Sequence, residues 1–331
     1  MSPFDHSIEA GNILRGLNPE QLRELANHHE TTASSGAARF ITEARSRSAK
    51  QTYIVEDGIE VGVRQQAMSV ERATELANQV RAHLKTREMI EVDCTLGDHP
   101  NWRLGCRLYV TSDYARLGYM WSQSLFPPAD DWKCDYMSIY VPDWPERVIF
   151  AHPTEKISFI LGTDYFGEAK KSFLRMAMWD TKQRGGIGLH AGSKVLRVRQ
   201  PTAGIQDFGL LLFGLSGTGK TTLTVHDCGL SSPEGVVIRQ DDVVLLTPGA
   251  GAAGTENGFF IKTEGLDSSQ EVLYNAALSP SSIFENVMLK DDGSLNFDDT
   301  SLTSNGRGVV LRSDVEGTDD SVDLEKVNAL I

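Results

Sequence analysis

A glycine-rich segment with the letters GLSGTGKTT contains Gly214, Gly219, Lys220 and Thr221 at the spacing G-x-x-x-x-G-K-[ST]. In this pattern glycines let backbone N–H groups converge on phosphate oxygens, the lysine reaches the terminal phosphates, and the threonine hydroxyl can hold a divalent ion. An apolar run, FGLLLFG, precedes the segment, and a helix is expected from Lys220. An ordinary glycine-rich turn is the alternative, but both flanks favour a phosphate cradle.

Two adjacent acids, Asp241 and Asp242, follow about twenty residues downstream in the run GVVIRQDDVVLL, which we expect to form one strand. Carboxylates at this place in phosphate-binding proteins orient a nucleotide-bound metal, and burying two of them without a cation is costly. Because side chains alternate along a strand, we expect one acid to bind metal and the other to be held by hydrogen bonds. The alternative is a strand end that turns into solvent.

Helices are predicted over residues 18–29, 69–86 and 168–181, each from apolar residues at helical spacing and the first two also from start signals. Strand-like runs fill most of residues 89–165. Together with the alternating strands and helix around Lys220, they predict an α/β fold with mixed sheets and helices.

The breaker QRGGIG indicates a domain boundary. We expect an N-terminal substrate-side domain over 1–185 and a nucleotide-binding domain over 186–331.

Composition limits the class of partner. The 331 residues carry a formal net charge of −13, so electrostatics give no reason to expect nucleic acid or an anionic membrane. The sequence has no apolar run of about 18 residues and no cationic start followed by an apolar stretch. Cys94, Cys106, Cys134 and Cys228 form no C-x-x-C pair, which favours a reducing cytoplasm.

Several segments together resemble the ATP-dependent phosphoenolpyruvate carboxykinase family. Seven segments occur in that family's order and approximate spacing: ARSRSAKQTYIV, GTDYFGEAKKSF, LHAGS, FGLSGTGKTTL, QDD, IFENVMLKDDGSLNFDD and NGRGVVL. The match covers roughly residues 40–312. The most specific element is Tyr-x-Gly-Glu-x-Lys-Lys ahead of the glycine-rich segment, and that segment resembles the ATP-using branch. The resemblance implies a two-lobed carboxykinase-like architecture.

The implied reaction, a step of gluconeogenesis, converts oxaloacetate and ATP into phosphoenolpyruvate, CO2 and ADP. The implied ions are Mn²⁺ at the transfer site and Mg²⁺ with the nucleotide. By resemblance Lys171, His190 and Asp242 are the Mn²⁺ ligands, and a lysine can coordinate only as the neutral amine. Taken alone, His190 would more often be a satisfied core histidine, but its place just before the apolar run of the glycine-rich segment favours a ligand. The alternative for Lys170 and Lys171 is one solvated lysine and one whose stem packs on a helix face. Because consecutive helical positions point about 100° apart, we expect Lys171 to bind metal and Lys170 to support phosphate or carboxylate charge.

The resemblance also assigns substrate contacts. Arg47 and Tyr165 match a substrate-binding arginine and tyrosine, although Arg45 lies close enough in sequence to leave the choice of arginine open. Arg307 matches an arginine that reaches the transferring phosphoryl group, and Glu285 matches a nucleotide-contacting glutamate. The expected phosphate contacts are Gly214, Leu215, Ser216, Gly217, Thr218, Gly219, Lys220, Thr221 and Thr222, of which Ser216 and Lys220 are also expected, with Asp241, to act in the reaction.

Family members continue beyond the segments matched here, so we expect the chain to be a fragment of a longer coding sequence, with its second domain truncated. The alternative is a naturally shortened protein. Two alternative functions are compatible with the sequence: a nucleotide-binding or regulatory module without turnover, and a protein kinase of the HPr kinase type. We expect a monomer.

Overall fold

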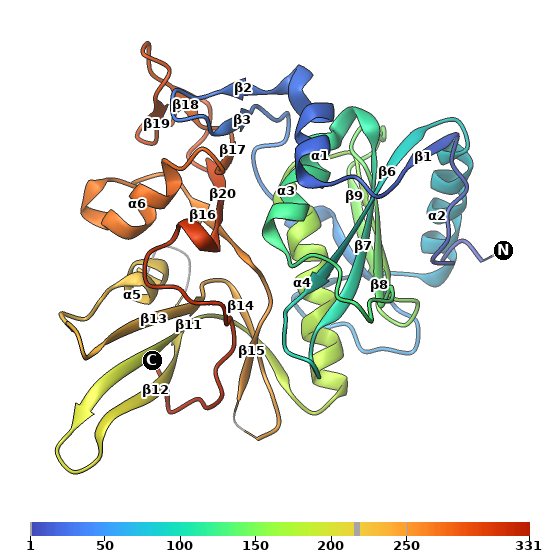
Figure 1. Cartoon of the computed structure of the whole chain (residues 1–331). Coiled ribbons are helices and arrows are strands. Elements are labelled where there is room, and N and C mark those ends of the chain that lie inside the picture. Colours follow the sequence, from blue (N-terminus) through green and yellow to red (C-terminus); the bar gives the residue numbers. More distant parts are fainter. Residues whose placement is uncertain (1, 215–218, 250) are drawn as a thin grey trace.

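The computed structural model describes residues 2–214, 219–249 and 251–331. It consists of mixed sheets and helices, which confirms the α/β class predicted from the sequence. Figure 1 shows one large sheet with its helices on one side of the molecule and the sheets formed mostly by the second half of the chain on the other.

The first lobe is built on an eight-stranded sheet with the order β1-β6-β7-β8-β10-β9-β4-β5. Parallel and antiparallel neighbours are mixed: β8 and β10 run parallel, whereas β6 and β7 are antiparallel. The strands are β1 (Asn12–Leu14), β4 (Thr52–Val55), β5 (Gln66–Met68), β6 (Glu88–Leu96), β7 (Leu104–Thr111), β8 (Tyr136–Val141), β9 (Val148–His152) and β10 (Ile157–Leu161).

Helices cover both faces of this sheet (Figure 1). The helix α2 (Val70–Leu84) packs on one face, and its start is capped by Ser69, as predicted. The helices α1 (Pro19–Ala26), α3 (Ala115–Ser124) and α4 (Phe166–Gln183) pack on the other. All three predicted helices are therefore confirmed, with α4 longer than expected.

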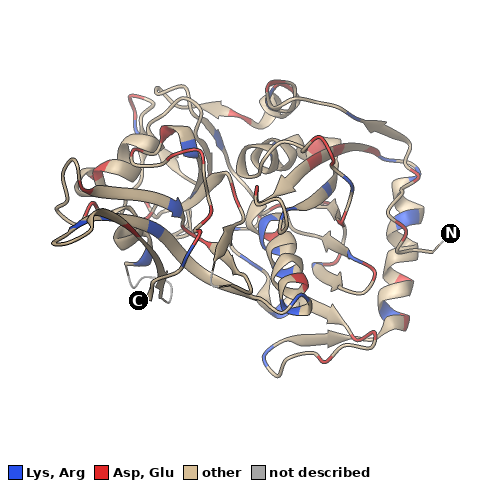
Figure 2. Ribbon diagram, turned by 60° about the horizontal axis from the view of Figure 1, so that its bottom comes forward, with Lys and Arg blue, Asp and Glu red and all other residues tan. Residues whose placement is uncertain are grey.

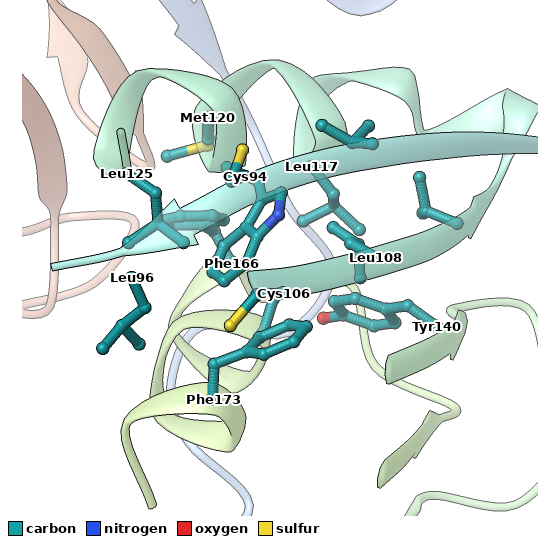
Figure 3. Close-up of a cluster of buried hydrophobic side chains, with 14 of the residues drawn as sticks. Cys94, Leu96, Cys106, Leu108, Leu117, Met120, Leu125, Tyr140, Phe166 and Phe173 are labelled. Atoms are coloured by element: carbon teal, nitrogen blue, oxygen red, sulfur yellow. The ribbon is translucent and has the colours of Figure 1, made fainter. Parts of the chain in front are cut away.

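The core of the first lobe fixes the position of α4. Phe173 of α4 stacks on Trp121 of α3 with ring centroids 4.3 Å apart. Figure 3 shows Phe173 and Phe166 beside Cys106 and Leu108 of the sheet. Because these side chains are buried and tightly packed, the N-terminal turns of α4 are held firmly against the sheet.

A six-stranded sheet forms part of the second lobe, with the path β15-β14-β11-β12-β21 and β13 paired to β11. Its strands are β11 (Ile187–Gln200), β12 (Gly204–Phe213), β13 (Gly235–Gln240), β14 (Val243–Leu246), β15 (Ala252–Gly254) and β21 (Ala329–Leu330). The prediction of a single strand over the run GVVIRQDDVVLL is wrong, because Asp241 and Asp242 lie in a bend between β13 and β14. Both strands pair with the long β11, with Gln240 opposite Ser193 and Val243 opposite His190, and the two acids between them pair with none of the described residues of β11. The register shift between Ser193 and Lys194 lies within the β11–β13 pair.

A five-stranded sheet joins both ends of the sequence, with the order β16-β20-β17-β3-β2. The early strands β2 (Thr31–Thr32) and β3 (Ala38–Phe40) lie beside β17 (Ile283–Glu285), β20 (Arg307–Leu311) and β16 (Gly258–Lys262). Nearby are the short helices α5 (Lys220–Val225) and α6 (Glu271–Ala277) and the hairpin β18 (Met288–Leu289) and β19 (Leu295–Asn296). The boundary placed after residue 185 stays a prediction, although the segment 31–40 belongs to this later sheet.

Acidic and basic residues are interspersed over both lobes in Figure 2. Among the described residues, no helix combines the length and the apolarity that crossing a membrane requires.

Candidate active site

A cavity of about 540 Å³ lies where α4, β11, α5 and β16 meet. Most of the residues singled out in the sequence line it. From the first lobe come Arg47, Tyr165, Gly167 and Lys171, and from the second come His190, Gly214, Gly219, Lys220, Thr221, Thr222, Asp241, Asp242 and Arg307.

Asp242 is the meeting point of the expected metal ligands. Lys171 Nζ lies 2.7 Å from both carboxylate oxygens of Asp242, and His190 Nε2 lies 2.8 Å from Oδ1. These side chains come from α4, from β11 and from the bend after β13, three separate stretches of the chain. The structure therefore brings Lys171, His190 and Asp242 together.

Lys170 also reaches Asp242, although we expected the two lysines to serve different groups. Its Nζ donates to Asp242 and, at 2.7 Å, to Glu256, and the side chain is completely buried. The flexible lysine stems overcome the 100° offset between neighbouring helical positions. Lys170 thus binds protein carboxylates and is absent from the cavity lining, whereas Lys171 faces the cavity.

The two lysines differ in electrostatics. Burial lowers the pKa of Lys171, and the neighbouring charge of Lys170 lowers it further. Burial acts the same way on Lys170, but the carboxylates of Asp242 and Glu256 outweigh it and raise its pKa. For Asp242, burial favours the neutral acid, yet Lys170, His190 and Lys171 together hold its pKa well below the usual range. The arrangement favours an ionised Asp242 and makes Lys171 the easier of the two lysines to deprotonate.

Asp241 faces the start of α5. Thr221 Oγ1 donates to Asp241 Oδ2 at 3.1 Å, and Lys220 Nζ donates to the Asp241 backbone carbonyl. Gly219 precedes the helix at φ +84, a left-handed conformation that favours glycine. Asp241 Oδ1 is buried without a hydrogen-bond partner among the described residues, and burial raises the pKa of this acid to about 6. The two acids therefore serve different partners: Asp242 meets the α4 lysines and Asp241 meets α5.

On the substrate side, Tyr165, Arg307 and the segment before β4 are linked by Asn305. Arg307 donates to Asn305 Oδ1 from Nε at 3.1 Å and from Nη2 at 2.8 Å. Asn305 Nδ2 in turn donates to the Arg45 carbonyl at 2.7 Å and to the Tyr165 hydroxyl at 3.3 Å. The Arg47 side chain is 42% exposed and lines the cavity, whereas Arg45 donates to Asn286, away from it. Of the two arginines, Arg47 is the one that can meet a ligand in the cavity.

Five of the expected nucleotide contacts are not among the described residues that line the cavity. Leu215, Ser216, Gly217 and Thr218 lie outside the described residues. Glu285 is described, but it lies in the core, completely buried, with Oε1 2.5 Å from Arg116 Nη1. It does not line the cavity, so the expected nucleotide contact of Glu285 has no support.

Other cavity residues were missed by sequence reasoning. Phe260 and Lys262 of β16 line the cavity, together with Glu264, Leu266 and Gln270 just after that strand. The ring of Phe260 also makes cation–π contacts with two side chains: its centroid is 5.6 Å from Lys170 Nζ and 5.7 Å from Arg307 Cζ. In the sequence this segment was predicted only as a short strand. Phe260 and Lys262 are two residues apart, so their side chains lie on the same face of a strand, and this spacing was the one signal that both could line a site.

The donor set fits a divalent transition metal. An amine with a lowered pKa, an imidazole and an ionised carboxylate are ligands that Mn²⁺ accepts. No group of three His, Cys, Asp or Glu side chains suited to a metal occurs among the described residues, so a site here depends on lysine as the third ligand. The unpartnered Asp241 oxygen beside Thr221 fits a second cation that accompanies a nucleotide.

Fold and cavity together define a mixed α/β protein in which paired acids face a lysine-bearing helix on one side and a glycine-rich helix start on the other. The chain belongs to the phosphoenolpyruvate carboxykinase family, whose model matches residues 11–331. The resemblance drawn from the sequence is thereby confirmed.

Two relatives are named as ATP-dependent members of the family. The chain is 40% identical to phosphoenolpyruvate carboxykinase (ATP) of Aeropyrum pernix over 223 residues, 67% of this chain and 45% of that protein. It is 27% identical to phosphoenolpyruvate carboxykinase (ATP) 2 of Salinibacter ruber over 337 residues, 93% of this chain and 60% of that protein. The chain thus spans less than two thirds of the length of each relative.

Proposed function

We propose that this chain carries the centre for ATP-dependent conversion of oxaloacetate into phosphoenolpyruvate, CO2 and ADP. The observation that carries the proposal is the convergence of Lys171 and His190 on Asp242, in the cavity that also contains Lys220 and Arg307. Family membership and the names of the relatives support ATP as the phosphoryl donor. The same membership argues against the HPr kinase alternative.

The chemistry requires one bond to break before another forms. The bond between the leaving carboxylate and the neighbouring carbon breaks, CO2 departs, and the electron pair remains as an enolate. The enolate oxygen then attacks the γ-phosphorus of ATP, and the bond from that phosphorus to ADP breaks. Decarboxylation supplies the nucleophile, so the step needs no general base.

The cavity residues would perform binding and charge stabilisation. Arg47 can bind a substrate carboxylate through two parallel hydrogen bonds, and Tyr165 can orient it by its hydroxyl. Lys220 and Arg307 can balance the charge that spreads over the transferring phosphoryl group. Holding both reactants in one cavity aligns the enolate oxygen with the γ-phosphorus.

Two cations fit this scheme. Mn²⁺ would be held by Lys171, His190 and Asp242, and Mg²⁺ would accompany the nucleotide beside Thr221 and Asp241. When bound, these ions supply Lewis-acid stabilisation of negative charge. The buried cation Lys170 keeps Asp242 ionised, which prepares that carboxylate for a metal.

The test is product formation by the purified chain. With oxaloacetate, ATP and Mn²⁺, we expect phosphoenolpyruvate and ADP in equal amounts, measured by ³¹P nuclear magnetic resonance. Binding of ATP without any phosphoenolpyruvate, in the presence of Mn²⁺ and Mg²⁺, would contradict the proposal and favour a nucleotide-binding module.

Further expectations remain proposals: a role in gluconeogenesis, a cytoplasmic location and a monomeric state. The first is supported by the family, and the second by the absence of a C-x-x-C pair among the four cysteines. Analytical ultracentrifugation of the purified chain tests the third, with a single species of the chain's own mass as the expected result.

A further inference from the structure

The segment that carries Arg47 is held by two acids at the start of α4. The backbone N–H groups of Glu43 and Ala44 donate to the two carboxylate oxygens of Asp164, at 3.0 and 2.8 Å. A few residues on, the Ser48 N–H donates to Glu168. The backbone on both sides of Arg47 is thus fixed by side chains of the first lobe.

Asp164 itself forms an ion pair with Arg116. Arg116 of α3 places Nη2 3.0 Å from Asp164 Oδ2 and Nη1 2.5 Å from Glu285 Oε1. Glu285 lies on β17 and also accepts the Phe166 N–H, near the start of α4, at 3.1 Å. We call Asp164, Arg116 and Glu285 the polar triad. It connects a strand of the second lobe to the segment that carries Arg47.

The three charged side chains of the polar triad are buried, so their desolvation opposes folding, and a gain in stability does not explain their presence. Arg116 is 4% exposed, Asp164 8%, and Glu285 is completely buried. Desolvation of such groups consumes much of their attraction, and well-packed apolar residues often stabilise a fold equally well. Apolar side chains could not accept the Glu43 and Ala44 N–H groups, so the triad adds specific placement of this backbone.

We infer that the polar triad is a positioning device for Arg47, and that Glu285 acts through Arg116 and Asp164 instead of contacting the nucleotide. The inference rests on the proposed function, in which Arg47 binds a substrate carboxylate. Arg116, Asp164 and Glu285 are positioning residues, since none of them lines the cavity. Their loss should therefore weaken carboxylate binding and leave ATP binding intact.

The experiment compares Asp164→Asn, Glu285→Ala and Glu285→Gln in the full chain. An asparagine nitrogen cannot accept the Ala44 or Arg116 hydrogen bond, and an alanine removes the acceptor for Arg116. Glutamine keeps an acceptor oxygen for Arg116, so it should restore much of what alanine loses. The matched control is Asp93→Asn, which removes a carboxylate paired with Arg107 at 2.7 Å elsewhere on the first sheet.

Three quantities are measured for each variant: amide hydrogen exchange of residues 43–48, the dissociation constant for oxalate and the dissociation constant for ATP, the last two by calorimetry. We expect Asp164→Asn and Glu285→Ala to speed exchange of the Glu43 and Ala44 amides and to weaken oxalate binding about tenfold or more. ATP binding should change by less than about twofold, and Asp93→Asn should match the unmodified chain in all three.

Unchanged exchange at residues 43 and 44 in every folded variant would overturn the inference, as would weakened ATP binding with normal oxalate binding in Glu285→Ala. The exchange readout is independent of turnover. If the unmodified chain makes no phosphoenolpyruvate, the proposed function fails while the triad is still tested. If Asp164→Asn does not fold, the contrast between Glu285→Ala and Glu285→Gln decides.

Discussion

Neighbouring lysines on α4 share one carboxylate, yet their surroundings shift their pKa values in opposite directions. Lys170 is buried between Asp242 and Glu256, so it remains a cation, whereas burial and the charge of Lys170 lower the pKa of Lys171. A neutral amine is the only form in which lysine can bind a metal. At the scale of single residues, the site therefore separates a structural cation from a candidate metal ligand.

This separation predicts an unusual result for Lys171→Arg. Because a guanidinium is permanently charged and offers no lone pair to a metal, arginine should weaken Mn²⁺ binding as much as methionine does, by at least ~10–100-fold. Titration of Mn²⁺ followed by electron paramagnetic resonance measures this, with Lys262→Arg, another cavity lysine, as the control. If Lys171→Arg binds Mn²⁺ normally while Lys171→Met does not, Lys171 acts as a charge and not as a ligand.

Glu285 predicts a pH dependence of stability. Burial raises its pKa from 4.5 to about 7, partly opposed by Arg116 from α3; Asp164, Tyr140 and Tyr165 also face it. Between these values the folded state binds one more proton than the unfolded state, so the stability is present below the unfolded pKa and lost as pH rises through 7.

The free energy of unfolding should thus fall by an amount on the order of 3 kcal/mol between pH 4.5 and 7, relative to Glu285→Gln, which cannot titrate. Urea unfolding at pH 5, 6 and 7 measures the difference. Parallel pH profiles for the two proteins would show that Glu285 titrates normally.

At the scale of elements, β11 connects both halves of the site. His190 lies near the start of this strand, and Lys194 lies four residues later, where its side chain contacts the end of α5. The buried Lys194 Nζ donates to the carbonyls of Leu223 and His226, at 2.6 and 3.0 Å, and so satisfies the carboxyl end of the helix whose start faces the cavity.

Replacing Lys194 with methionine should leave both carbonyls unsatisfied. We expect the free energy of unfolding to fall by about 1–3 kcal/mol. Affinity for ATP should fall as well, because the start of α5 loses its fixed position. Chemical denaturation and calorimetry measure the two effects, and Lys182→Met, at an exposed position on α4, is the control. Full stability and ATP affinity in Lys194→Met would refute this role.

Local sequence patterns predicted the glycine-rich segment and the Ser69 cap. The set Lys171, His190 and Asp242 comes from three separate stretches, and only the family resemblance pointed to it. The burial of Glu285 and its contact with Arg116 could not be predicted, because they depend on strands far apart in the chain. The break between β13 and β14 falls at Asp241 and Asp242, and we expected one strand because the apolar residues on both sides of the acids read as a single run.

At the scale of the whole molecule, the two lobes share a sheet. The strand β3 near the start of the chain pairs in parallel with β17, and Phe40 of β3 is buried in the core. The second lobe therefore depends on residues 31–40 for one edge of its five-stranded sheet. Cutting the chain at residue 185 would expose that edge.

We expect residues 186–331, expressed alone, to be poorly folded, with fast amide exchange in β17 and β20. Adding residues 1–185 as a separate chain should restore protection, because β2 and β3 can then pair with β17. Hydrogen exchange followed by mass spectrometry compares the two preparations. A stable, protected 186–331 segment on its own would support two independent domains.

The most direct test is the location of Mn²⁺ in crystals grown with ATP, found by anomalous X-ray scattering at the manganese edge. The account predicts a single strong peak among Lys171 Nζ, His190 Nε2 and a carboxylate oxygen of Asp242, beside the γ-phosphate. A manganese peak elsewhere, with Lys171 and His190 still bonded to Asp242, would contradict the carboxykinase site described above.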